Sequence, residues 1–154
     1  MGLGEEVTDG SILRLKAPRQ GIGPYASGAR IEDFLPSSGD KAAALRTGMI
    51  LVSVFHRSKT SLKQCLAFRR TSTETEALQL EVPAVRSIRA PERAEPLAVV
   101  GDPLPLPDSD LPGADGHCGI KGLAREPQEP RAIQRYLCSR LVEIARPADP
   151  DPAA

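Results

Sequence analysis

The sequence has very few aromatic residues and no tryptophan. Phe and Tyr together make up 3% of its 154 residues, so it lacks the stacking platforms of single-stranded nucleic-acid binders and has little bulk for a large core. Its charges also cancel, because 20 basic residues are balanced by 20 acidic ones. A chain without net charge has no overall field to attract nucleic acid or an anionic membrane. We therefore expect neither as a partner.

Long apolar runs and paired cysteines are missing as well. The longest apolar run, residues 49–55, is far too short to cross a bilayer. The first residues hold no basic stretch followed by an apolar one, which argues against a signal peptide. The three cysteines, Cys65, Cys118 and Cys138, are odd in number and widely spaced, unlike a disulfide framework. These features predict a soluble cytoplasmic protein without membrane insertion.

Motifs that carry chemistry are scarce. His56 and His117 are the only histidines, and neither stands in a hydrolase motif such as Gly-x-Ser-x-Gly. No phosphate-binding loop with Gly-Lys-Ser/Thr occurs. His117 is followed by Cys118, but no second pair of ligands stands at zinc spacing. The sequence therefore predicts a protein that is not an enzyme and has no metal or cofactor.

Proline divides the chain. Three of its 15 prolines precede Pro83, and twelve lie from Pro83 onward. Because proline lacks a backbone donor, residues 91–112 are expected to form neither a central strand nor a helix interior, with at most a short strand at 97–100. Residues 113–122 hold four glycines, and we expect them to be flexible. Residues 84–129 are thus predicted to be a mostly irregular Pro/Gly-rich linker.

An amphipathic helix is predicted over residues 130–146. Pro130 suits its first turn, Pro147 ends it, and apolar residues spaced by three and four form one stripe. These are Ile133, Tyr136, Leu137, Leu141 and Ile144. A helix of this length is marginal alone in water, so it packs on the first domain, on another copy or on a partner; packing within the chain is favoured. Residues 147–154 are predicted to be a disordered tail.

Residues 15–82 hold several motifs in a fixed order. The segment Gly21-Ile22-Gly23-Pro24-Tyr25 follows Lys16; its glycines let successive backbone N–H groups face one point, as in an anion nest. By itself such a segment is more often an ordinary turn. A strand-like run at 29–35 closes on a Pro-Ser-Ser-Gly turn at 36–39.

The second half of this order consists of a helical turn, a strand, a helix and a last strand. A turn of helix at 42–48 leads into the apolar strand 49–54. Ser61 and Gln64 form a capping-box pattern for a helix over 61–70, and residues 77–82 alternate like a strand. The residues expected in the core of this region are Leu45, Leu51, Val52 and Val54, and the apolar residues of the helix are Leu62, Cys65, Leu66 and Phe68.

This order of motifs resembles a PDZ domain, a module that captures the C-terminal end of a partner protein. The resemblance covers about residues 10–83 and implies an α+β fold, a small strand sandwich or partly open barrel with two helices. The Pro-rich extension and the C-terminal helix would follow it. It also implies a non-catalytic adaptor or scaffold that binds a partner's C-terminal peptide by strand addition. The alternative is a largely disordered regulatory protein that acts through its Pro-rich segment and C-terminal helix.

The resemblance assigns the peptide site to two elements. The glycine loop would hold the ligand's terminal carboxylate, assisted by Lys16 or Arg19, and the first residues of the helix, Ser61 or Leu62, would select a ligand side chain. Pro24 departs from the family's pattern, because it has no N–H to donate to an added strand. The full set of expected peptide-binding residues is Lys16, Gly21, Ile22, Gly23, Pro24, Tyr25, Ser61, Leu62, Cys65 and Phe68.

A basic-directed phosphorylation motif follows the helix. Arg69-Arg70-Thr71-Ser72 would place the phosphate on Ser72, near the helix C-terminus, where negative charge is unfavourable. Because such short motifs recur by chance, a solvated loop is the favoured interpretation.

Overall fold

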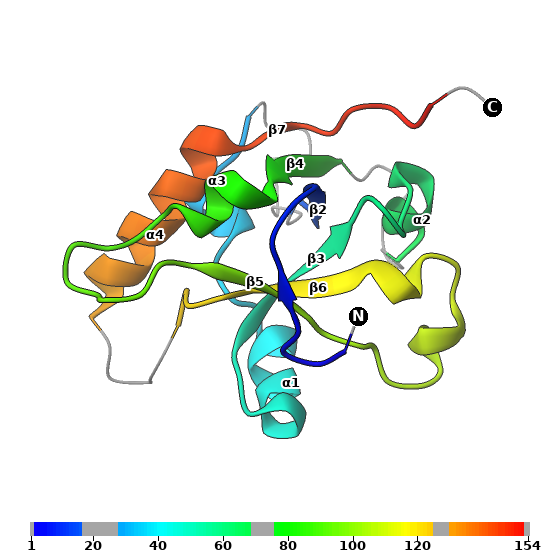
Figure 1. Cartoon of the computed structure of the whole chain (residues 1–154), viewed down its shortest axis with the longest axis horizontal. Helices are drawn as coiled ribbons and strands as arrows, with labels where there is room; N and C mark the ends of the chain where they lie inside the picture. Colours follow the sequence, from blue (N-terminus) through cyan, green and yellow to red (C-terminus); the bar gives the residue numbers. More distant parts are fainter. Residues whose placement is uncertain (1, 17–27, 69–75, 125–129, 153–154) are drawn as a thin grey trace, which may run out of the picture.

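The strands that the structure describes form one open antiparallel sheet (Figure 1). The computed structural model describes residues 2–16, 28–68, 76–124 and 130–152. The strands, in the sheet order β1-β5-β6-β3-β2-β4-β7, are β1 Glu6–Val7, β5 Ala98–Gly101, β6 His117–Lys121, β3 Leu51–His56, β2 Ser11–Leu15, β4 Ala77–Glu81 and β7 Arg146–Pro147. The helices are α1 Ser38–Thr47, α2 Leu62–Ala67, α3 Val82–Arg86 and α4 Arg131–Ile144, with short 3-10 helices η1 Ile31–Asp33, η2 Asp108–Asp110 and η3 Ala114–Gly116. The expected α+β class is confirmed, but the described strands do not close into a barrel.

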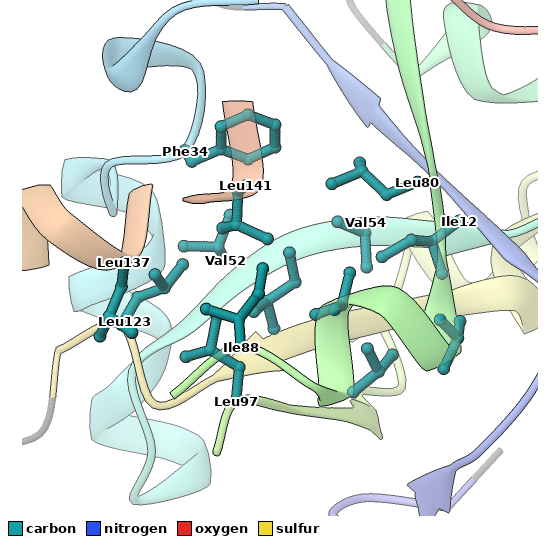
Figure 2. Packing of buried hydrophobic residues seen from close by; sticks show 14 of the residues in the cluster. Ile12, Phe34, Val52, Val54, Leu80, Ile88, Leu97, Leu123, Leu137 and Leu141 are labelled. Carbon is teal, nitrogen blue, oxygen red and sulfur yellow. The ribbon is translucent and has the colours of Figure 1, made fainter. Parts of the chain in front are cut away.

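The two faces of the sheet carry different helices. Helices α3 and α4 cover the main core, where Val52 and Val54 of β3 are fully buried (Figure 2). Helix α2 covers the other face, where Leu13, Phe55 and Cys65 form a smaller cluster. Successive residues of a strand point to opposite faces, so β3 contributes to both clusters. The expected core positions in β3 are confirmed as buried.

Helix α4 packs on its own chain. Leu137, Cys138 and Leu141 are buried in the main core, and Ile133 packs against its edge. Tyr136, expected on the same stripe, is exposed. The preference for packing in cis is thus confirmed. Among the described residues, no helix is long and apolar enough to span a bilayer.

Residues 84–129 were expected to be a mostly irregular linker, but two strands of the sheet, β5 and β6, lie within this range. Strand β6 lies between β5 and β3 near the centre of the sheet, and β5 lies between β1 and β6. Residues 97–102 contain no proline, so β5 keeps the backbone donors that a sheet requires. Gly119 of β6 allows close packing rather than flexibility, because a Cβ atom there would collide with the Leu51 side chain.

Three local expectations before β3 are corrected. Residues 29–35 contain η1 instead of a strand, closed by a hydrogen bond of 2.8 Å from the Arg30 N–H to the Asp33 carboxylate. The Pro-Ser-Ser-Gly run begins α1, because the Ser37 hydroxyl accepts the Asp40 N–H and the Asp40 carboxylate accepts the Ser37 N–H. Leu45, expected in the core, is 93% exposed on α1. The strand expected over residues 77–82 is β4, which ends at Glu81, because α3 begins at Val82.

Candidate functional site

Half of the expected peptide-binding residues can be placed. Residues 21–25 and Ser72 lie outside the described residues. Lys16 is described and is only 1% exposed; its Nζ donates to the Gly28 carbonyl at 2.8 Å and lies 3.9 Å from the Glu76 carboxylate. Its ammonium is therefore engaged inside the protein, whereas the resemblance implied that it would assist a ligand carboxylate.

The other four expected residues gather on α2. The capping box is confirmed: the Ser61 hydroxyl accepts the Gln64 N–H, and the Gln64 side chain accepts the Ser61 N–H, both at 3.0 Å. Cys65 is fully buried, Leu62 packs beside it, and the Phe68 ring lies 4.6 Å from the Phe55 ring between centroids. On the outer side of the helix, Ser61 and Phe68 line a cavity of about 400 Å³. These residues thus anchor α2 to the sheet and leave an apolar hollow beside it.

The edge of β4 is occupied by a segment of the same chain. Strand β7 pairs antiparallel with β4, with Pro147 opposite Leu78 and Arg146 opposite Gln79. The Ala148 N–H then donates to the Ala77 carbonyl at 3.1 Å. We call residues 146–151 the β7 segment. The prediction of a disordered tail over 147–154 is corrected for the described residues 147–152, because this pairing and the contacts below offset the entropy of ordering.

Gln79 and Arg57 hold the middle of the β7 segment. The Asp149 N–H donates to Gln79 Oε1 at 3.0 Å, and the Asp149 carboxylate accepts from Gln79 Nε2 at 3.2 Å. Arg57 Nη1 donates both to the Asp149 carbonyl at 2.6 Å and to Gln79 Oε1 at 2.9 Å. Gln79 is only 4% exposed, so its amide is held in a fixed place for these contacts.

The Asp151 carboxylate binds Arg57 and the first residues of α2. It accepts from Arg57 Nη2 and the Leu62 N–H, both at 2.8 Å, and from the Lys63 N–H at 3.1 Å. The two backbone N–H groups, followed by Arg57, hold the pKa of Asp151 below its ordinary value, because they bind the ionised form. Arg57, Lys59 and Lys63 all line the groove beside the segment. The surroundings therefore favour negative charge at this position.

The edge of β4 and these side chains together bind an extended acidic segment. Backbone groups of β4 pair with the backbone of the β7 segment, and Gln79 and Arg57 hydrogen-bond to the carboxylates of Asp149 and Asp151, two residues apart. No family model, curated protein or solved structure matches this chain. The functional assignment therefore rests on the contacts that the chain itself makes.

Ser53, His117 and Asp102 form a second polar cluster. The sequence did not predict it, because these residues come from three separate segments of the chain. Ser53 Oγ is hydrogen-bonded to His117 Nε2. His117 Nδ1 lies 2.5 Å from the Asp102 carbonyl oxygen and 3.6 Å from the Asp102 carboxylate. The sequence does show that Ser53 and His117 are polar residues in or next to otherwise apolar segments. It does not show that the two side chains are in contact.

Burial keeps His117 neutral. Desolvation is the largest influence and lowers the pKa of His117 from its ordinary value of 6.5, against the opposing effect of Asp102 and Asp40; Arg46 lowers it further. As the pH falls below 6.5, the unfolded chain binds a proton at this residue before the folded chain does. The stability that the neutral ring contributes is therefore present above pH 6.5 and is lost below it.

We expect the free energy of unfolding to fall between pH 7 and pH 5, with His117 contributing a slope of up to about 1.4 kcal/mol per pH unit. Urea denaturation at several pH values measures this slope. His117→Gln, which cannot titrate, should have a flatter profile. An unchanged slope in that variant would assign the pH dependence to other groups.

Proposed function

We propose that this chain is a protein–protein interaction module that binds the C-terminal segment of a partner by strand addition. The β7 segment is the observation that carries the proposal, because it is an extended acidic peptide already bound to the edge of β4 in cis. In strand addition, backbone hydrogen bonds supply affinity and side-chain contacts supply selectivity. The partner's segment would be extended and acidic, with a carboxylate positioned for Arg57. Binding of this kind requires no metal and no cofactor.

The PDZ resemblance remains part of this proposal. It is supported by β3 and β4, which were expected from the order of motifs and which pair with the two sides of β2. It is also supported by α2, which packs on β2 and β4 through Cys65. A cytoplasmic location and a role as an adaptor belong to the same proposal. The three cysteines are free thiols, as is usual in reducing compartments.

The β7 segment competes with any partner for the same edge. Because it is tethered to the site, its effective concentration is high, on the order of millimolar for short flexible linkers. A partner's apparent affinity is reduced by the fraction of molecules in which the edge is occupied. The module is thus closed by its own chain until a partner displaces the segment.

Loosening the β7 segment should expose the site. In the full chain, Asp149→Asn combined with Asp151→Asn should raise the affinity for an added peptide of residues 145–152 about tenfold, because the tethered segment loses its charge-assisted hydrogen bonds and occupies the edge in a smaller fraction of molecules. Fluorescence anisotropy with a labelled peptide measures the affinity. A peptide that ends at residue 151 should also bind more tightly as a free acid than as an amide.

Two variants serve as controls. Asp110→Asn with Asp115→Asn removes the same charge from exposed residues between β5 and β6 and should leave peptide affinity at the value of the unaltered chain. Arg57→Gln, added to the Asp149 and Asp151 changes, should abolish the gain. Equal peptide affinity in the unaltered chain and in the double variant, or binding that survives the loss of Arg57, would count against the proposal.

A further inference from the structure

Ser53, His117 and Asp102 are arranged as a nucleophile, a base and an orienting group. A carbonyl oxygen only accepts hydrogen bonds, so the contact between His117 Nδ1 and the Asp102 carbonyl places the ring proton on Nδ1. Nε2 then carries the lone pair and accepts the hydroxyl proton of Ser53. The ring also packs in an edge-to-face arrangement with Phe55, with centroids 5.1 Å apart and an interplanar angle of 70°. This is the tautomer that a general base needs.

The cluster opens into a cavity between α1 and the sheet. Ser53, His117 and Asp102 line this cavity of about 190 Å³ together with Asp40, Ala43 and Arg46 of α1. The volume corresponds to about six water molecules at the density of the liquid. A short acyl group therefore fits beside the Ser53 hydroxyl, whereas a folded polypeptide does not.

Charged groups lie where the charges of acyl transfer would develop. The Asp102 carboxylate, 3.6 Å from His117 Nδ1, stabilises the protonated ring. Its Oδ1 atom is buried and has no hydrogen-bond partner among the described residues, and it lies 3.8 Å from Arg46 Nη2. The Arg46 side chain is 45% exposed and lines the same cavity, so the cavity wall carries a cation that would favour a developing oxyanion.

We propose that Ser53 is a nucleophile toward esters with a short acyl group, with His117 as its general base and Asp102 as the positioning residue of that base. Ser53 Oγ bonds to the carbonyl carbon while its proton passes to His117 Nε2. The bond from that carbon to the leaving alcohol oxygen breaks, and the alcohol takes the proton from Nε2. Water then attacks the acyl carbon by the same route, which releases the carboxylic acid and restores Ser53. This activity is independent of peptide binding at the β4 edge.

The chain offers an internal comparison in a second Ser–His pair. Ser58 Oγ lies 2.7 Å from His56 Nδ1, and His56 Nε2 lies 2.8 Å from the Asp9 carbonyl. Ser58 is exposed in the turn after β3, and this pair is formed by residues two apart in sequence. Ser58 therefore has a histidine partner but lines the wide groove beside the β7 segment instead of the smaller cavity that Ser53 lines.

Reaction with a small fluorophosphonate tests the proposal on the full chain. Oγ of the nucleophile bonds to phosphorus and fluoride leaves, so peptide mass spectrometry locates the adduct directly. We expect the adduct on Ser53 and not on Ser58, and we expect the release of p-nitrophenol from p-nitrophenyl acetate by the modified protein to fall to the rate measured without protein. His117→Gln should slow labelling by about 100-fold or more, and Ala43→Leu, which fills the cavity, should slow it as well.

The variant Asp102→Asn tests whether Asp102 positions the His117 ring or only contributes to packing. If Asp102 acts through His117, this variant should shift the pH profile of labelling as well as lower its rate, while Ser58→Ala should label like the unaltered chain. Labelling of Ser53 no faster than labelling of Ser58 would overturn the proposal. A labelling rate that His117→Gln leaves unchanged, in protein with an unaltered circular dichroism spectrum, would overturn it too. Either result leaves the peptide-binding proposal untouched, because that site uses other residues.

Discussion

A fragment of residues 2–90 should fail to fold, although it contains the whole region that resembles a PDZ domain. It ends after α3 and lacks β5, β6 and α4, so β3 loses one of its two neighbours. The main core loses Ile120, Leu137 and Leu141, all fully buried. Each buried side chain of this size contributes about 1.5–3 kcal/mol, and a domain's whole stability is about 5–15 kcal/mol. Circular dichroism and thermal melting should show an unfolded chain without a cooperative transition.

The matched control is a chain of residues 2–145, which keeps α4 and loses only the β7 segment with the residues after it. It should melt cooperatively, because β7 pairs with only two residues of β4. A cooperative transition in the fragment 2–90 would instead establish an independent first domain that ends near residue 83.

Val54→Asp should destabilise the protein by more than about 4 kcal/mol, at the severe end of single substitutions. Val54 is fully buried in the main core between the strands β2 and β6, and an unpaired carboxylate there loses its hydration without a compensating partner. The same change at an exposed apolar residue provides the control. Leu45→Asp should shift the stability by no more than about 0.5 kcal/mol, because Leu45 is 93% exposed.

Urea denaturation of both variants measures the difference. Equal midpoints would contradict the burial of β3. A large loss at Leu45 would instead indicate that α1 packs against a partner or another copy in solution.

The elements foreseen from the sequence are those that local patterns determine. Ser61 and Gln64 cap α2 through neighbours three residues apart, and the stripe of α4 depends only on helical spacing. Strand β6 could not be predicted in this way. Its glycines look like a flexible segment, and Gly119 is required only because Leu51, almost 70 residues earlier, lies against it.

The candidate sites show the same contrast between features set by local sequence and features set by distant residues. Four of the expected residues gather on α2 because one helix carries them, whereas Arg57, Gln79 and Asp151 meet across separate segments. The β7 segment has the composition of a disordered tail, and its order comes from contacts with residues about 70 to 90 positions away. Ser53 and His117 are 64 residues apart. No pattern within one segment reports such a pairing.

The place of β6 has a consequence for how the chain assembles. Strands β2, β3 and β4 are complete by residue 81, yet the strand that completes the centre of the sheet begins at His117. A ribosome that has released only the first hundred residues therefore exposes one side of β3 with unpaired backbone groups. Pairings between such distant residues require a large loop to close first, which makes folding slow in comparison with helical proteins. An exposed strand of apolar residues is also the kind of intermediate that aggregates or binds chaperones. The synthesis of residues 82–121 is thus the interval in which this protein is most vulnerable.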